Sequence, residues 1–206
     1  MMDAMVQLPL AVVTGASSGI GEAIARELHK RGHDVVLVAR GVPRLEGLAK
    51  ELSGTVGPTA EAIASDLTTA TGLDAVQSLI AERRPDVLVN CAGAGWRGAF
   101  SEQPPEGLDE LIELNIVALA QLSRAAFALM IARGTGKLMN VSSTASFVPG
   151  PSVAAYHASK AFVTSLTEAL HVEASRTDVH VTALCPGITP TRFQARAGTA
   201  HAHLPG

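Results

Sequence analysis

Short apolar runs alternate with amphipathic segments along almost the whole chain, and this alternation constrains the fold more than any other feature. Four of the runs lack a polar residue at every second position, so we expect strands covered on both faces, as in parallel sheets. Repeated strand–helix–strand units predict an α/β fold, a doubly wound parallel sheet with helices on both faces. The expected strands are 10–14, 34–38, 59–63, 86–90, 137–141 and 179–185, and the expected helices are about 20–31, 42–53, 72–83, 105–133 and 153–176.

The length and composition fit a single domain over residues 1–206. Apolar residues make up 47% of the chain and charged residues 17%, so enough apolar surface is present to exclude a disordered chain. A formal net charge of −3 offers no basic face for nucleic acid. The apolar runs are interrupted before the roughly 18–20 residues that a membrane span needs. The N-terminus carries Asp3 and no basic region, so we expect no signal peptide and a cytoplasmic protein.

The two cysteines, Cys91 and Cys185, each lie at the end of an expected strand. If these strands are not neighbours, two strand spacings of ~4.8 Å separate the thiols by about 10 Å. That distance is too long for a disulfide, so we predict two free, buried thiols in a reducing compartment. The seven histidines and two cysteines show no metal-ligand spacing.

The first expected strand leads directly into a glycine-rich turn and a helix. Gly15 permits the tight turn, Gly19 lets a pyrophosphate approach the backbone, and Gly21 lets the helix pack closely on the sheet. The helix N-terminus offers N–H groups to phosphate, and Ser17 and Ser18 add hydroxyl donors. Glycine is common in turns, but the strand before and the helix after favour a Rossmann-type dinucleotide site.

The second expected strand ends with Ala39 and Arg40, and no carboxylate follows in the sequence until Glu46. An acidic residue here would hold a ribose 2′-hydroxyl, whereas arginine suits a 2′-phosphate. NADP(H) is therefore favoured over NAD(H), although Arg40 can also be a solvated loop residue. Asp66 is placed to accept a hydrogen bond from adenine, or alternatively to cap the helix that begins near residue 72.

Tyr156 and Lys160 lie four residues apart on an expected helix, so both project from one face. An ammonium near the phenol is expected to lower the tyrosine pKa and make it a general acid or base near neutrality. Such a pair is also common as a snorkelling surface pair. The surrounding alanines favour close backbone approach and hence a site.

Three further polar residues are candidates for the same site. Ser142 and Ser143 follow the fifth expected strand, where ligands bind in open α/β sheets. Asn115 stands within an apolar helix and needs a buried partner, which can be catalytic, local backbone or water.

These motifs together resemble the short-chain dehydrogenase/reductase family in its single-domain branch. TGASSGIG (14–21) matches the TGxxxGxG loop, NCAG (90–93) is similar to NNAG, YHASK (156–160) matches YxxxK, and PGITPT (186–191) matches PGxxxT. The resemblance spans residues 8–193 and leaves 194–206 as a substrate-loop or C-terminal tail.

The resemblance implies a role for each candidate catalytic residue. Tyr156 would donate or accept the proton, Ser143 would bind the substrate oxygen, and Lys160 would bind the nicotinamide ribose while acidifying Tyr156. Asn115 would hold a water that links Lys160 to solvent. We expect the remaining cofactor contacts at Ile20, Leu67, Asn90, Ala92, Gly93, Pro186, Gly187, Ile188, Thr189 and Thr191.

The family also implies a strand order of 3-2-1-4-5-6 with a seventh strand beyond. The sequence stops at Gly206 with no apolar run left for that strand, so either the sequence is a shortened form or this member lacks the element. In both cases we expect an edge at the sixth strand and an incompletely walled substrate pocket. Trp96, Phe147 and Phe193 are candidate apolar substrate contacts, though such residues are as often simple packing.

The resulting hypothesis is an NADP(H)-dependent oxidoreductase that interconverts a small-molecule carbonyl and a secondary alcohol. One alternative is a non-catalytic NADP(H)-binding sensor or scaffold. Another is a 3-oxoacyl-(acyl carrier) reductase, for which Arg97, Arg124 and Arg133 would form a docking patch. Pairing of the helices 105–133 and 153–176 between subunits, as in the family, predicts a homodimer or homotetramer.

Overall fold

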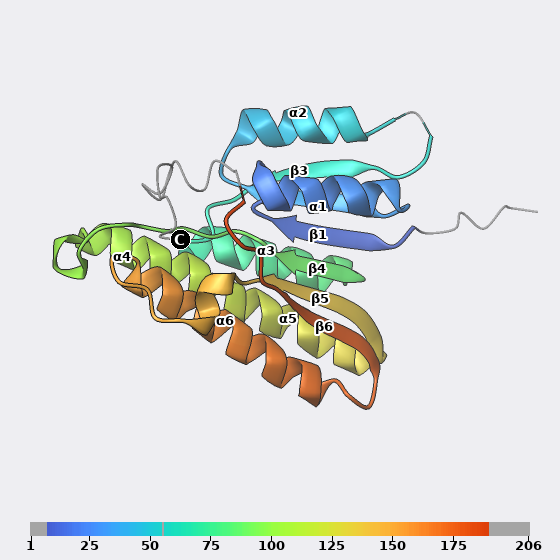
Figure 1. Cartoon of the computed structure of the whole chain (residues 1–206). Helices are drawn as coiled ribbons and strands as arrows, with labels where there is room; N and C mark the ends of the chain where they lie inside the picture. The colour runs from blue at the N-terminus through green and yellow to red at the C-terminus, as the bar shows by residue number, and fades with distance from the viewer. Residues whose placement is uncertain (1–7, 55, 190–206) are drawn as a thin grey trace, which may run out of the picture.

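The computed structural model describes residues 8–54 and 56–189. Within them, six strands form one parallel sheet in the order β3-β2-β1-β4-β5-β6, which confirms the expected doubly wound topology (Figure 1). The strands are β1 (Leu10–Thr14), β2 (Asp34–Ala39), β3 (Ala60–Ala64), β4 (Val87–Asn90), β5 (Thr135–Val141) and β6 (Asp178–Leu184). Each lies within two residues of an expected run. Among the described residues β6 is an edge of the sheet.

Helices cover both faces of the sheet (Figure 1). One face carries α1 (Gly19–Lys30) and α2 (Val42–Leu52), and the other carries α3 (Ala70–Arg83), α4 (Pro105–Ile112), α5 (Leu119–Arg133) and α6 (Ala154–Glu173). The apolar side chains form two clusters, one on each side of the central strands. Val12 of β1 points into one cluster and Val13 into the other, as successive residues of a strand covered on both faces must.

The long expected helix over residues 105–133 is continuous but irregular. A π-helical segment, Glu113–Ala118, joins α4 to α5. By length and composition the whole segment would suffice to cross a membrane, although residues such as Asn115 and Arg124 interrupt its apolar run. Here it serves as a core helix, because Leu111, Leu122 and Met130 are each about 1% exposed against the sheet and its neighbours.

The topology creates a crevice beside the centre of the sheet. β1 connects to β2 on one side, whereas β4 connects to β5 on the other, so the loops after β1 and β4 diverge. Ligands in doubly wound sheets bind at this point, outside the carboxyl ends of the strands. The glycine loop follows β1, and the NCAG motif begins at Asn90, the last residue of β4, and continues into the loop after it.

The two cysteines confirm the expectation from strand order. β5 separates β4 from β6, and both Cys91 and Cys185 are free thiols. Each is partly rather than fully buried, because each lies just past the carboxyl end of its strand.

Candidate active site

The glycine loop brings two strand ends into contact. Gly15 has a φ of +67°, and a Cβ at this position would lie 2.8 Å from the backbone nitrogen of Ala92. Only glycine therefore fits between the loop after β1 and the loop after β4. A Cβ on Gly21 would overlap the carbonyl oxygen of Gly15, so this glycine lets α1 pack close to the turn.

These loops border a cleft of about 750 Å³ at the carboxyl ends of the strands. The structure brings eighteen of the predicted site residues to it: Gly15, Ser17, Ser18, Gly19, Ile20, Arg40, Asp66, Leu67, Ala92, Gly93, Trp96, Ser143, Tyr156, Lys160, Pro186, Gly187, Ile188 and Thr189. The N-terminus of α1 opens into this cleft, and Ser18 does not use its hydroxyl to cap the helix. The cradle fits a dinucleotide, since backbone N–H groups, hydroxyls and an unobstructed glycine turn meet there.

Other predicted residues lie elsewhere. Gly21, Asn90 and Asn115 are behind the cleft wall, and Phe147 points outward with 64% of its surface exposed, which corrects its assignment as a substrate contact. Thr191 and Phe193 fall outside the described residues.

Asn90 belongs to a buried polar network rather than to the cofactor cleft. Its Nδ2 donates to Ser123 Oγ at 3.0 Å and to Asn140 Oδ1 at 2.9 Å. Asn140 Nδ2 in turn donates to Thr167 Oγ1 at 3.0 Å. The network ties β4 and β5 to α5 and α6, so Asn90 supports the site from below.

The candidate catalytic residues converge at one end of the cleft. Tyr156 lies in the first turn of α6, and Ser143 follows β5 and accepts a hydrogen bond from the Ala145 N–H at 3.1 Å. Burial raises the pKa of the Tyr156 phenol above its ordinary value, and the hydrogen bond with Ser143 only partly opposes this. The expectation that the neighbouring ammonium lowers this pKa is therefore wrong, because desolvation outweighs any charge effect.

Lys160 is buried at the base of the cleft, with 5% of its surface exposed. Its Nζ lies 5.8 Å from the centroid of the Tyr156 ring and donates to the Val141 carbonyl oxygen at 2.9 Å. Burial lowers the pKa of Lys160 to about 8, and the nearby Cys91 and Cys185 oppose this shift. The side chain is thus mainly an ammonium at neutral pH, with hydrogen-bond donors beyond the one used by Val141.

Ser142 holds the catalytic helix against the sheet. Its Oγ donates to the Lys160 carbonyl oxygen at 2.9 Å and shares a hydrogen bond of 2.7 Å with Thr164 Oγ1. The two adjacent serines therefore have separate tasks, since Ser142 fixes α6 and only Ser143 bonds Tyr156.

Asn115 acts as a clamp within the π-helical segment. Its Nδ2 donates to the Ala94 carbonyl oxygen at 2.9 Å and to Ser159 Oγ at 3.0 Å, while its Oδ1 accepts from the Ala94 N–H at 2.8 Å. Both amide hydrogens are engaged, so the side chain has none left to donate to a relay water. Its partners lie 21 and 44 residues away in the sequence, so they are tertiary contacts and not the local backbone of the alternative. π-segments are common at functional sites, and this one turns Asn115 toward the loop after β4.

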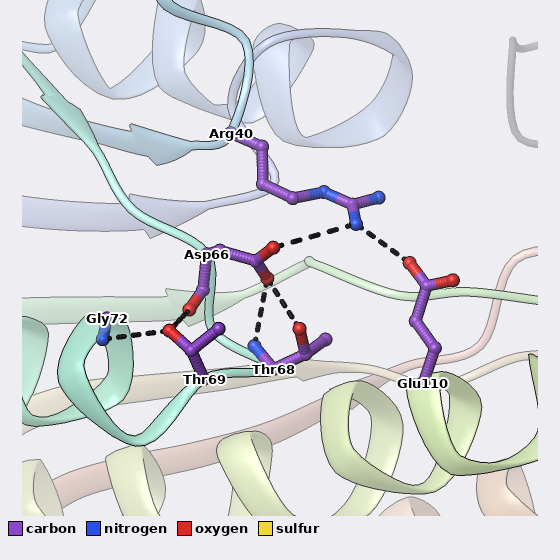
Figure 2. Close-up of polar contacts among 6 residues, drawn as sticks. All are labelled: Arg40, Asp66, Thr68, Thr69, Gly72 and Glu110. Carbon is purple, nitrogen blue, oxygen red and sulfur yellow. Dashed lines mark hydrogen bonds and ion pairs between the residues drawn. The ribbon is translucent and has the colours of Figure 1, made fainter. Parts of the chain in front are cut away.

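The opposite end of the cleft is built around Arg40 (Figure 2). Arg40 Nη1 lies 2.8 Å from Glu110 Oε1 and 4.0 Å from Asp66 Oδ2. Asp66 Oδ1 accepts from both the N–H and the hydroxyl of Thr68, at 3.1 and 2.7 Å. Partial burial alone would raise the pKa of Asp66, but the bonds from Thr68 and the charge of Arg40 hold it below its usual value.

The alternative role of Asp66 as a helix cap is taken by another residue. Thr69 caps α3, with its Oγ1 accepting from the Gly72 N–H at 3.1 Å (Figure 2). Asp66 instead closes the turn before the helix and keeps one oxygen toward Arg40.

Sequence reasoning missed Glu110 and Leu114, which line the cleft from α4 and the π-segment. Neither carries a local signal, because each reaches the site only through the packing of the long helix across the strand ends. The arginines named for the alternative docking patch do not all lie at the cleft. Arg97 borders the cleft, whereas Arg133 bonds the carbonyls of Arg84 and Pro85 at the opposite, amino end of the sheet.

The chain is similar to known proteins over most of its length. The family model described as short chain dehydrogenase matches residues 9–202. An uncharacterized oxidoreductase of Staphylococcus epidermidis is 33% identical over 190 residues, which are 91% of this chain and 81% of the relative.

Two solved structures are similar over most of the chain. A short-chain dehydrogenase from Sphingobium yanoikuyae in complex with NADPH has a TM-score of 0.89 and 41% identity, covering 93% of this chain and 76% of that one. A bulky-bulky ketone specific alcohol dehydrogenase from Comamonas testosteroni has a TM-score of 0.85 and 36% identity, covering 89% and 74%.

Proposed function

Since the chain belongs to the short-chain dehydrogenase/reductase family of oxidoreductases, we propose that it interconverts a ketone and a secondary alcohol with NADP(H). One observation carries the proposal. A single cleft connects the glycine cradle at the N-terminus of α1 with the hydrogen-bonded pair Ser143 and Tyr156. A nucleotide site and a proton donor thereby share one cavity.

The chain's own residues would manage the proton and the orientation of the substrate. Because burial raises the pKa of Tyr156, the phenol stays protonated at neutral pH and is ready to donate in the direction of reduction. Ser143 bonds Tyr156 and can bind the same substrate oxygen. Lys160 has ammonium donors for ribose hydroxyls. The reduced nicotinamide, when bound, supplies the hydride.

Arg40 supports the preference for NADP(H). It is the cation at the end of β2 in the cleft wall, where a guanidinium can bind a 2′-phosphate through two hydrogen bonds. The similar Sphingobium yanoikuyae protein has NADPH bound. Glu110 and Asp66 temper this preference, since they already interact with Arg40.

Apolar walls at the catalytic end support a ketone with apolar substituents as substrate. Trp96, Val148, Val153 and Ile188 border the cleft that contains Tyr156. The similar Comamonas testosteroni enzyme is specific for bulky-bulky ketones. We therefore propose ketones with two sizeable apolar groups for this chain.

Steady-state absorbance of the reduced nicotinamide tests the function. A panel of ketones, from small aliphatic to diaryl, is tested with NADPH and with NADH at neutral pH. We expect consumption of NADPH with bulky apolar ketones and a higher kcat/KM with NADPH than with NADH. Calorimetric binding of NADPH without turnover of any ketone or aldehyde would instead support the non-catalytic sensor.

We also propose that the protein forms a homodimer or homotetramer in the cytoplasm through the outer faces of α4, α5 and α6. Ile112 on α4 and both Phe162 and Val172 on α6 are exposed apolar residues, at 38, 38 and 68%. Size-exclusion chromatography with light scattering would show a monomer if this proposal is wrong.

A further inference from the structure

An ion pair bridges the adenosine end of the cleft. Arg40 extends from the end of β2, and Glu110 extends toward it from α4, so that the guanidinium and the carboxylate meet at 2.8 Å (Figure 2). Both residues line the cleft, and they come from opposite walls. The pair therefore connects the two walls at the position where a 2′-phosphate would be bound.

The charges around Arg40 are unbalanced. One guanidinium faces two carboxylates, those of Asp66 and Glu110, so the cluster has a net charge of −1. Asp66 is anchored by two hydrogen bonds from Thr68. Within the described part of the chain, Glu110 has no side-chain partner except Arg40. Glu110 is thus the carboxylate whose interactions depend entirely on Arg40.

We propose that Glu110 is a specificity-determining residue that competes with the 2′-phosphate for Arg40. The inference rests on the proposed binding of NADP(H). A 2′-phosphate must replace the Glu110 carboxylate as the partner of Arg40, and the displaced carboxylate then repels it from nearby. NAD(H) has a hydroxyl at this position and leaves the ion pair intact. Glu110 therefore weakens the binding of NADP(H) but not that of NAD(H), and it reduces the preference for NADP(H) that Arg40 creates.

The expected effect is moderate because the groups are partly solvated. The side chains of Arg40 and Glu110 are 51 and 41% exposed, and ion pairs of this kind contribute little in water. Removing the Glu110 charge removes both its competition for Arg40 and its repulsion of the 2′-phosphate, and both losses tighten NADP(H) binding. Together they correspond to about a three- to tenfold gain in affinity at low ionic strength, and the gain shrinks as salt screens both effects.

The test is calorimetric binding of adenosine 2′,5′-bisphosphate and 5′-AMP, two fragments that differ by the phosphate in question, together with NADPH and NADH. The variant is Glu110→Gln, which keeps the side-chain shape. The control is Asp109→Asn on the same helix, because Asp109 is exposed, does not border the cleft and changes the net charge equally. Thermal unfolding verifies that both variants are folded.

We expect Glu110→Gln to bind adenosine 2′,5′-bisphosphate and NADPH about three- to tenfold more tightly, with 5′-AMP and NADH changed by less than about twofold. Asp109→Asn should change none of them by more than about twofold. Equal affinities for wild type and Glu110→Gln, or an equal gain for ligands with and without the 2′-phosphate, would overturn the inference.

The variant Arg40→Ala distinguishes a failure of this inference from a failure of the proposed NADP(H) preference. If Arg40→Ala weakens NADPH selectively while Glu110→Gln has no effect, only the role of Glu110 is wrong. If Arg40→Ala leaves the ratio of NADPH to NADH affinity unchanged, the proposed NADP(H) preference fails and the role of Glu110 fails with it.

Discussion

The two ends of the cleft are built on different physical principles. At the adenosine end, Arg40, Glu110 and Asp66 are 51, 41 and 40% exposed and interact as full charges. At the catalytic end, Lys160 is 5% exposed and Asn115 is fully buried, and the contacts are hydrogen bonds to backbone and hydroxyl groups. Water therefore screens one end and is largely excluded from the other.

This contrast determines what each end can control. Burial shifts the pKa of Tyr156 upward and that of Lys160 downward, so the catalytic end sets protonation states. Exposed ion pairs contribute little free energy and exchange partners easily, so the adenosine end is suited to discriminating between cofactors. Substitutions should consequently affect chemistry at one end and binding at the other.

The substitution Tyr156→Phe should show the largest difference between the two ends, because it affects catalysis and not cofactor binding. Removing the hydroxyl removes the proton donor, and general acid catalysis contributes on the order of 10²–10⁴-fold. We expect kcat to fall about 10³-fold while NADPH affinity changes by less than about twofold. Quenching of the single tryptophan, Trp96, which lines the cleft, reports binding in the same samples. Turnover above about a tenth of the wild-type value would contradict the role of Tyr156.

Arg40→Ala should produce the reverse pattern. Charge-assisted hydrogen bonds contribute about 1.5–3 kcal/mol, so NADPH affinity should fall roughly 10- to 100-fold. NADH affinity and the kcat at saturating cofactor should change by less than about twofold. Arg44→Ala is the matched control, because Arg44 is exposed in the following helix and does not line the cleft. Equal losses for both cofactors would show that Arg40 does not contact the 2′-phosphate.

The buried end should also give a pH-dependent stability. The pKa of Lys160 is about 8 in the folded chain and near its ordinary 10.5 when unfolded. Between these values the unfolded chain binds more protons, so the free energy of unfolding rises with pH. From pH 7 to pH 9 Lys160 should contribute a rise of about 1 kcal/mol. The raised pKa of Cys91 begins to oppose this rise as the pH approaches 9, and that of Tyr156 opposes it at higher pH.

Urea unfolding at several pH values measures this slope. Lys160→Met should abolish the rise, whereas Lys50→Met, which removes an exposed lysine, should retain it. An unchanged slope in Lys160→Met would contradict the assignment of the low pKa to Lys160.

The smallest expected effect concerns salt. Raising the ionic strength from about 0.05 to about 0.5 M shortens the Debye length and screens the exposed charges. We expect NADPH affinity to fall about threefold more than NADH affinity, with kcat at saturation nearly constant. Fluorescence titrations of Trp96 at the two ionic strengths measure both affinities. A salt-sensitive kcat with a constant affinity ratio would reverse the assignment of the two ends.

Much of the frame was predictable because its signals are local. Every strand position follows from an apolar run, and the glycine loop was predicted from the strand before it and the helix after it. The structure adds the close approach of Gly15 to Ala92. Tyr156 and Lys160 share a helix face, as their spacing requires. Free Cys91 and Cys185 follow from the strand order.

The remaining features depend on tertiary packing. The sequence has no carboxylate close to Arg40, yet in the folded chain Arg40 is paired with Glu110, which lies 70 residues further along. The sequence near Arg40 therefore did not reveal its carboxylate partner. The predicted direction of the Tyr156 pKa shift was wrong, because the spacing of Tyr156 and Lys160 indicates that a charge is near but not how deeply the phenol is buried. The separation of Ser142 from Ser143 likewise depends on how α6 packs against β5.

A crystal structure of the NADPH complex tests most directly the claim that both ends form one site. We expect the 2′-phosphate on Arg40 with the Glu110 carboxylate displaced from it. We also expect the nicotinamide beside the Tyr156 hydroxyl, with Lys160 against the ribose. A nicotinamide bound away from Tyr156, or a tyrosine hydroxyl turned out of the cleft, would contradict it.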